Sequence, residues 1–246
     1  PKQTSSELFL LYQPQINSED VCLGAEALIR WKHPVFGYIY PPLIIYLAKE
    51  GGLLPKLESL LFEMACEAIQ ITSKEYDGDF KISVNITAKS LLWDIEKCIE
   101  ENLKKYQIPT EKLWIEITEQ DMIANSNIVI DKLSRLKKVG HTLLIDDFGM
   151  GHTSLLYLQS NYFDVVKLDG SLVGKMLDLE TNQKIISSIV KLGSELDVAV
   201  IAEYVENDQQ REKLLELGCK RYQGYLFSKP VSLEEFIVYL KAHGER

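Results

Sequence analysis

The feature that most constrains the fold is a regular alternation of short β-rich runs with longer amphipathic segments. Several β-rich runs, such as Ile82-Ser83-Val84, are almost continuously apolar, which is typical of parallel strands covered on both faces. The expected strands are Phe9–Gln15, Cys22–Ile29, Lys81–Ile86, Leu113–Thr118, Thr142–Asp146, Val165–Leu168, Val198–Glu203 and Gln223–Phe227. The expected helices are Pro42–Glu50, Leu57–Thr72, Ser90–Tyr106, Ile128–Val139, Thr153–Gln159, Thr181–Leu196, Asp208–Leu217 and Leu233–His243. Eight strands alternating with helices over 246 residues predict an α/β fold, a TIM-type (β/α)8 barrel.

The first two expected strands depart from this pattern. Only Ile16–Val21 separates them, which is too short for a parallel crossover. We therefore expect an antiparallel hairpin, with the first strand antiparallel to the rest of the barrel. No low-complexity stretch or Pro/Gly-rich linker divides the chain, so residues 1–246 are interpreted as a single domain. The start at Pro1 favours a domain excised from, or at the C-terminal end of, a larger protein with regulatory domains upstream.

The charge balance excludes one class of partner. The chain carries 36 acidic and 27 basic residues, a formal net charge of −9. Binding to duplex DNA or RNA is not expected, because it needs a basic face that displaces counterions. Bound cations still allow an acidic chain to hold a phosphodiester. Four scattered cysteines and no run of 18 apolar residues favour a cytoplasmic domain, or the cytoplasmic domain of a membrane-anchored protein.

Polar residues lie at or near the end of almost every expected strand, where barrel enzymes carry their active sites. A carboxylate flanked by apolar residues, such as Glu116, is costly to bury unless it is paired or metal-bound. Lys167 and Arg30 are the only cations in these runs. The oxygen donors are Glu26, Asn85, Glu116, Asp146, Asp147 and Glu203. They suit Mg²⁺ or Mn²⁺ rather than zinc, and the adjacent pair Asp146-Asp147 can serve two ions. The residues alone leave metal-assisted hydrolysis and enolisation open.

A series of short motifs then identifies a family. They are Tyr12-Gln13-Pro14, Glu26-Ala27-Leu28, Arg30-Trp31-Lys32-His33-Pro34, Val84-Asn85-Ile86-Thr87, Glu116-Ile117-Thr118-Glu119, Asp146-Asp147-Phe148-Gly149-Met150-Gly151, Lys167-Leu168-Asp169, Ala202-Glu203-Tyr204-Val205-Glu206 and Gln223-Gly224-Tyr225. In this order, from about residue 8 to residue 230, they resemble the EAL family of cyclic di-GMP phosphodiesterases. The resemblance implies a two-metal hydrolase, using Mg²⁺ or Mn²⁺, that converts cyclic di-GMP to linear pGpG.

The resemblance also implies roles for individual residues. One ion would be held by Glu26, Asn85, Glu116 and Asp146, and the second by Asp146, Asp147 and Glu203. Lys167 would hydrogen-bond the attacking water. Glu119 would anchor the loop after the fifth strand, through which relatives often form a homodimer, and Glu206 would support the site. Contacts with the substrate are expected from Gln13, Arg30, Asp169 and Gln223.

Four positions depart from the family pattern. Tyr204 stands where the family usually has Gly, Met150 where it has Thr, Gly170 where it has Arg and Leu172 where it has Phe. Because no acidic ligand is missing, we expect effects on rate or regulation rather than loss of the chemistry. Two alternatives remain open: a weak or inactive EAL domain that acts as a cyclic di-GMP receptor, and an enolase-type barrel enzyme that abstracts a proton with a Lys base.

Overall fold

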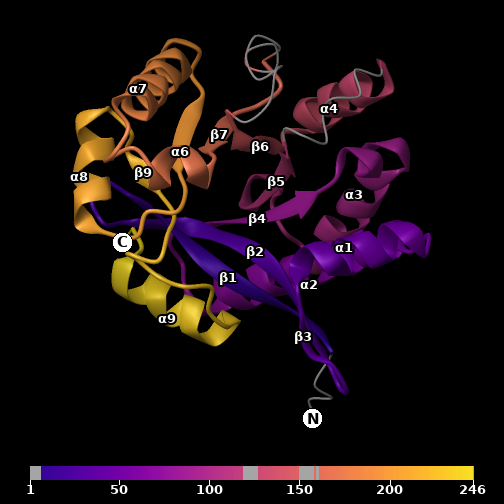
Figure 1. Cartoon of the computed structure of the whole chain (residues 1–246). Coiled ribbons are helices and arrows are strands. Elements are labelled where there is room, and N and C mark those ends of the chain that lie inside the picture. Colours follow the sequence, from indigo (N-terminus) through magenta and orange to yellow (C-terminus); the bar gives the residue numbers. More distant parts are fainter. Residues whose placement is uncertain (1–6, 119–126, 150–157, 159–160, 246) are drawn as a thin grey trace.

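Eight strands close into a barrel around the centre of the molecule (Figure 1). The computed structural model describes residues 7–118, 127–149, 158 and 161–245. The strands run in the order β1-β9-β8-β7-β6-β5-β4-β2, and pairing of β1 (Leu8–Asn17) with β2 (Cys22–His33) closes the ring. β1 is antiparallel to β2 and to β9 (Arg221–Tyr222), whereas the other barrel pairs are parallel. The predicted barrel and its antiparallel first strand are confirmed.

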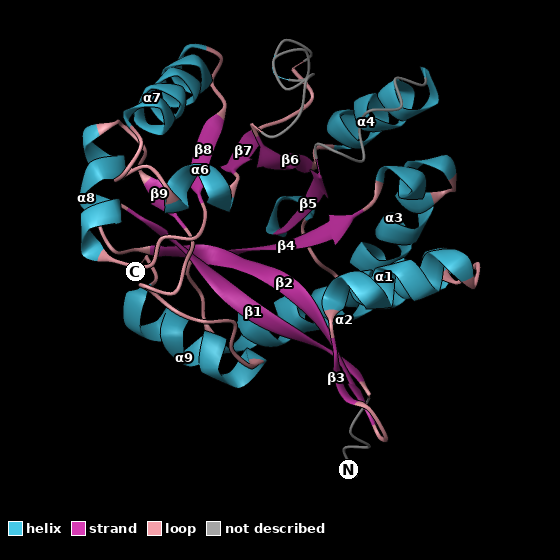
Figure 2. Cartoon of the chain, in the orientation of Figure 1, coloured by secondary structure: helices cyan, strands magenta, loops and turns pink. Residues whose placement is uncertain are grey.

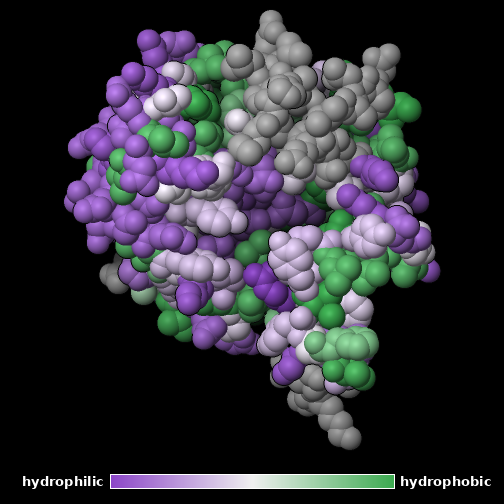
Figure 3. All heavy atoms as spheres, in the orientation of Figure 1, coloured by the Kyte–Doolittle hydropathy of each residue, from purple (hydrophilic) through white to green (hydrophobic). Residues whose placement is uncertain are grey.

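The other barrel strands lie close to their predicted positions. They are β4 (Lys81–Ile86), β5 (Leu113–Thr118), β6 (Thr142–Phe148), β7 (Val165–Leu168) and β8 (Ala199–Ala202). A short additional strand, β3 (Gly37–Ile39), pairs with the end of β2 outside the ring. The resulting hairpin projects from the barrel and carries a hydrophobic patch (Figure 3). β3 is not predicted, because three residues are too few to show a strand period.

Helices surround the barrel (Figure 2). They are α1 (Pro41–Glu50), α2 (Leu54–Glu75), α3 (Ile95–Tyr106), α4 (Asn127–Val139), α6 (Gly170–Gly174), α7 (Glu180–Glu195), α8 (Asp208–Glu216) and α9 (Leu233–His243), with 3-10 turns at Ala88–Leu92 and Thr110–Lys112. Among the described helices, none is both long enough and apolar enough to cross a bilayer. The predicted helix Thr153–Gln159 lies outside the described residues except for Leu158.

Two predicted elements are wrong in their bounds. The last barrel strand is Arg221–Tyr222, not Gln223–Phe227. It ends because the backbone turns at Gly224, where a Cβ atom would lie 2.1 Å from the carbonyl oxygen of Val205. The predicted helix Ser90–Tyr106 is divided into a 3-10 turn and α3. The division follows from Ser90, which is buried and forms a capping box with Thr87 instead of lying on a helix face.

Candidate metal-binding active site

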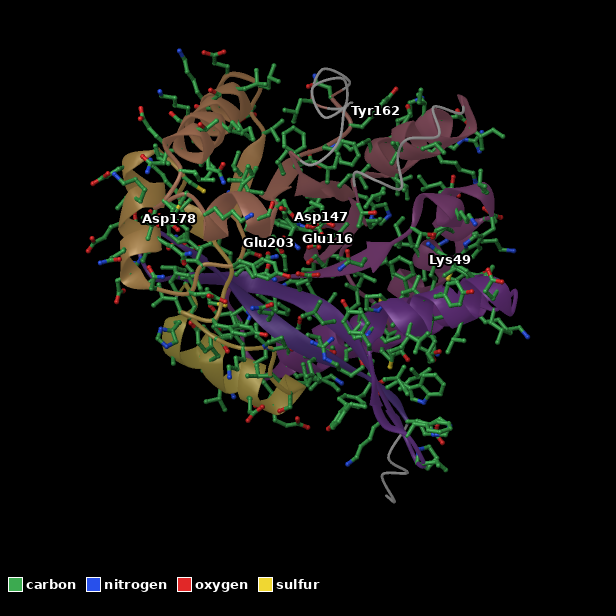
Figure 4. All side chains as sticks on the ribbon, viewed as in Figure 1. Lys49, Glu116, Asp147, Tyr162, Asp178 and Glu203 are labelled. Carbon is green, nitrogen blue, oxygen red and sulfur yellow. The ribbon has the colours of Figure 1, made fainter. Side chains whose placement is uncertain are left out.

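Five carboxylates meet at one end of the barrel. Glu26 on β2, Glu116 on β5 and Asp146 on β6 form a group whose oxygen atoms lie within 4.8 Å of one another. Asp146, Asp147 and Glu203, which follows β8, form a second group with the same spacing. Figure 4 shows Glu116, Asp147 and Glu203 close together at the centre of the barrel. Asp146 belongs to both groups, as expected for a residue that bridges two ions.

Lys167 on β7 lies in the middle of these carboxylates and has no exposed surface. Its Nζ atom is 2.9 Å from an oxygen of Glu26, of Glu116 and of Glu203, and 3.4 Å from Asp146 Oδ1. Burial alone would lower the pKa of Lys167, but the surrounding carboxylates raise it well above its ordinary value. Lys167 is therefore an ammonium ion shared among four carboxylates.

Burial and neighbouring charges shift the pKa values of the carboxyl groups. Burial, reinforced by neighbouring carboxylates, raises the pKa of Glu116 to about 8 and that of Asp147 to about 6. Burial also raises the pKa of Glu203 well above its ordinary value, although Lys167 opposes the shift. Burial disfavours the charged form of Glu26 as well, but Lys167 and hydrogen bonds from other side chains lower its pKa overall. Without further cations, this cluster holds more negative charge than it can stabilise.

The cluster fits divalent cations in charge and in donor type. When all five carboxylates are ionised they carry five negative charges, of which the Lys167 ammonium neutralises one. Two divalent cations would balance the four that remain. Glu116 Oε1 is buried and, among the described residues, has no hydrogen-bond partner. All donors in the two groups are carboxylate oxygens, which Mg²⁺ and Mn²⁺ prefer.

Amide side chains hold Glu26 from two sides. Asn85 Nδ2 donates to Glu26 Oε1 at 2.6 Å, and Gln223 Nε2 donates to Oε2 at 2.7 Å. Gln223 in turn accepts from Gln15 Nε2 at 3.0 Å and donates to Gln13 Oε1 at 3.3 Å. Gln15 is a positioning residue that the sequence analysis misses. The available signal is its spacing of two from Gln13, which places both side chains on the same face of β1.

A cavity of about 530 Å³ opens over the carboxylates. On the face seen in Figure 3, hydrophilic residues fill the central hollow. Its walls include Arg30, Gln13 and Glu206 from the predicted set. Three tyrosines that the sequence analysis does not assign to substrate binding also line it, namely Tyr40, Tyr204 and Tyr225. A larger cavity of about 800 Å³, between α3 and α4, contains none of the five clustered carboxylates.

Those remaining predicted residues that the structure describes lie at the margin of this site. Asp169 caps α6 by accepting a hydrogen bond from the Ser171 backbone at 2.8 Å. The side chain of Arg30 donates to the carbonyl of Ile29 at 2.8 Å. Glu206 is exposed. Glu119 lies outside the described residues, as does the loop from residue 150 onward, so their predicted roles stay predictions.

Comparisons with known proteins bear on the family and on the fold. The family model of the EAL domain matches residues 2–230. The chain is 36% identical over 231 residues to the signaling protein YkoW of Bacillus subtilis, covering 92% of this chain and 28% of that protein. It is 32% identical over 240 residues to the cyclic di-GMP phosphodiesterase RocR of Pseudomonas aeruginosa, covering 96% of this chain and 60% of RocR.

Solved structures show the same fold. The Pseudomonas aeruginosa MucR phosphodiesterase in complex with c-di-GMP superimposes with a TM-score of 0.88 at 30% identity, covering 94% of both chains. The EAL enzyme Bd1971, bound to cAMP and cyclic di-GMP, gives a TM-score of 0.89 at 31% identity, covering 95% of this chain and 64% of that one. The chain spans about a third of the length of the first curated relatives it matches. With the family match over residues 2–230, the chain belongs to the EAL domain family.

Proposed function

We propose that this EAL domain is a metal-dependent phosphodiesterase that hydrolyses cyclic di-GMP to linear pGpG. The observation that carries the proposal is the convergence of five carboxylates into two groups that share Asp146. RocR and MucR are named as cyclic di-GMP phosphodiesterases, and the MucR structure is a c-di-GMP complex, which supports the choice of substrate. We do not propose an enolase-type reaction, because the match to the EAL domain family covers nearly the whole chain.

The residues of the two groups define the metal sites. Glu26, Asn85, Glu116 and Asp146 would hold one ion, and Asp146, Asp147 and Glu203 the other. When bound, two Mg²⁺ or Mn²⁺ ions would supply a water that is nucleophilic at neutral pH and would neutralise charge on the phosphate. The remaining side chains of the cavity then have to bind the dinucleotide, orient the water and accept its proton.

Lys167 would orient the water and stabilise the negative charge that develops at phosphorus. We assign Lys167 as a hydrogen-bond donor to this water, because its Nζ atom lies among the carboxylates that would hold the ions. The acceptor would be a carboxylate. Glu203 meets this requirement, because it lines the cavity and its carboxylate has a second oxygen besides the one that would hold the ion. We assign Glu206, at the rim of the cavity, and Glu119 to supporting roles.

Arg30 would bind one phosphate of the dinucleotide. Its side chain lines the cavity, and a guanidinium can donate two parallel hydrogen bonds to a phosphate. Gln13, also in the cavity wall, and Asp169, beside Asp147, would contact the ligand as well. Gln223 would act mainly through Glu26, because its side chain is only 2% exposed and donates to that carboxylate.

A second candidate function is a cyclic di-GMP receptor with little or no turnover. One observation favours it: Tyr204 stands in the cavity wall, next to Glu203, in a backbone conformation that favours glycine. Such a receptor would bind the dinucleotide in the same cavity. Binding and cleavage therefore have to be measured separately.

The test is hydrolysis of cyclic di-GMP by the purified domain with Mg²⁺ or Mn²⁺, using wild type, Glu26→Ala and Glu19→Ala. Glu19 is an exposed turn residue between β1 and β2 and serves as the matched control. The proposal predicts pGpG from wild type and from Glu19→Ala, and none from Glu26→Ala. Binding without product in wild type would support the receptor, and equal activity in Glu26→Ala would exclude a metal role for that carboxylate.

A further inference from the structure

We infer that Tyr204 is a specificity-determining residue that stacks against one purine base of the dinucleotide. The inference rests on the proposed function and deepens it, because it names the part of the ligand that this side chain recognises. Three independent observations carry it: the backbone conformation of Tyr204, the contact of its ring with Gly170, and the exposure of the ring to the cavity.

The backbone of Tyr204 is unusual for a bulky residue. Its φ angle is +56°, in the left-handed region. A residue with a large side chain rarely adopts this conformation, which glycine, asparagine and aspartate tolerate best. In the described part of the chain, it is the one aromatic residue with a positive φ. The position therefore carries a tyrosine against the preference of its own backbone, which indicates a use for the side chain.

The position of the ring depends on Gly170, the first residue of α6. A Cβ atom on Gly170 would lie 2.1 Å from Cδ2 and 2.5 Å from Cγ of Tyr204. Any other residue at 170 would therefore displace the ring. The ring of Tyr204 therefore packs against the backbone of Gly170 at the edge of the active-site cavity.

The ring contributes little to the core, because Tyr204 is 63% exposed. It lines the same cavity as Asp147 and Glu203. A ring that is held from one side and open on the other provides a flat face for a planar ligand. Purine bases stack on such faces, whereas a phosphate would be bound by the hydroxyl group rather than by the ring, a difference that Tyr204→Phe tests. The part of cyclic di-GMP that Tyr204 would recognise is accordingly a guanine.

The test compares wild type, Tyr204→Asn and Tyr204→Phe, with Tyr46→Asn as the matched control. Asparagine tolerates the left-handed backbone, so the first variant removes the ring without adding strain. Tyr46 is an exposed tyrosine on α1 that does not line the cavity. The readouts are the Kd for cyclic di-GMP with Ca²⁺ in place of Mg²⁺, the KM and kcat with Mg²⁺, and the melting temperature of the free domain.

We expect Tyr204→Asn to raise Kd and KM by about 5- to 150-fold, the range for loss of one base–aromatic stack. The change in kcat should be smaller, and the melting temperature should not fall, because a strained residue has been relieved. Tyr204→Phe keeps the ring and should recover most of the lost binding, and Tyr46→Asn should bind like wild type.

Four outcomes would overturn the inference. Wild-type binding by Tyr204→Asn would show that the ring does not touch the ligand. A parallel fall in melting temperature and binding would show that Tyr204 acts only through folding. If wild type neither binds nor cuts cyclic di-GMP, the proposed function fails together with the inference. Cleavage by wild type with unchanged KM in Tyr204→Asn overturns the inference alone.

Discussion

Lys167 is the residue on which the stability of the metal-free site depends, because its ammonium neutralises part of a buried cluster of carboxylates. Removing one partner of a buried ion pair costs about 3–5 kcal/mol. We therefore expect Lys167→Met to lower the free energy of unfolding by about that amount in EDTA. The loss should be smaller with Mg²⁺, since bound cations replace the missing charge. Urea denaturation under both conditions measures the two values.

The matched control for this prediction is Lys184→Met. Lys184 pairs with Glu180 at 2.8 Å, but both side chains are exposed, and exposed pairs contribute little. If Lys167→Met and Lys184→Met are equally stable in EDTA, Lys167 does not carry the charge balance of the site.

The raised pKa values of Glu116 and Asp147 predict an unusual pH dependence in the absence of metal. Their ordinary values are 4.5 and 3.8, and burial raises them to about 8 and about 6 in the folded chain. Over this range the folded state binds more protons than the unfolded state, so the metal-free domain should lose stability as pH rises from about 5 to 8. Melting temperatures in EDTA across this range test the sign. A melting temperature that rises with pH would contradict destabilisation by the ionised carboxylates. Added Mg²⁺ should reduce the dependence of the melting temperature on pH.

At the scale of elements, the approach of β2 to β4 depends on Gly24. Gly24 pairs with Lys81, and a Cβ atom at this position would lie 2.1 Å from the Lys81 carbonyl oxygen. We expect Gly24→Ala to cost about 1–3 kcal/mol, the usual penalty for overpacking. Activity should fall as well, because Glu26 lies two residues further along β2. Denaturation curves and cleavage rates provide the measurements.

Gly174→Ala is the control for this prediction, because no atom lies within 4 Å of a Cβ atom built at that position. Gly24 also has a φ angle of +155°, so a difference between the two variants reports the contact between β2 and β4 together with backbone strain at Gly24. Equal stability of the two variants would show that the strands can separate to admit a methyl group.

The accuracy of the predicted elements depends on local signals at their ends. α9 has the predicted bounds and begins at a capping box formed by Ser232 and Glu235, and α7 agrees to within one residue. The strand β9 has only two residues, and the apolar run after Gln223 led to a predicted strand that begins after β9 has ended. α6 has five residues and is fixed by the Asp169 cap rather than by a pattern. Short elements of this kind depend on tertiary contacts that a single sequence does not show.

At the scale of the whole molecule, the sequence indicates which residues form the site better than how they interact. Glu26, Glu116, Asp146, Asp147 and Glu203 are predicted from strand ends, and the barrel brings them together. The contacts between side chains on different strands of the barrel could not be predicted from the sequence. Lys167 and Glu26 are 141 positions apart, and their 2.9 Å contact depends on closure of the barrel. The role of Gln15 beneath Gln223 depends on the same closure.

The barrel should also be stabilised as a unit by its ions. A ligand at about 100 times its Kd adds about 2.7 kcal/mol per site, so two Mg²⁺ ions should together raise the melting temperature by about 10–20 °C. Asp146→Asn should remove most of this rise, because Asp146 belongs to both groups. The control is Asp131→Asn, which alters an exposed carboxylate on α4. A full Mg²⁺ response in Asp146→Asn would contradict the shared site.

Larger assemblies remain predictions. Curated relatives such as YkoW are about three times as long as this chain, which is consistent with regulatory domains upstream. A homodimer through the loop after the fifth barrel strand involves residues outside the described ranges. Sedimentation of the purified domain measures this association, and a monomer at all concentrations would contradict it.

Metal-dependent cleavage is tested most directly by measuring the formation of pGpG from cyclic di-GMP as a function of free Mg²⁺ or Mn²⁺. We expect no product in EDTA, and a rate that rises with metal until two ions are bound per chain. Saturation of the chain with cyclic di-GMP and two ions, without formation of pGpG, would contradict it.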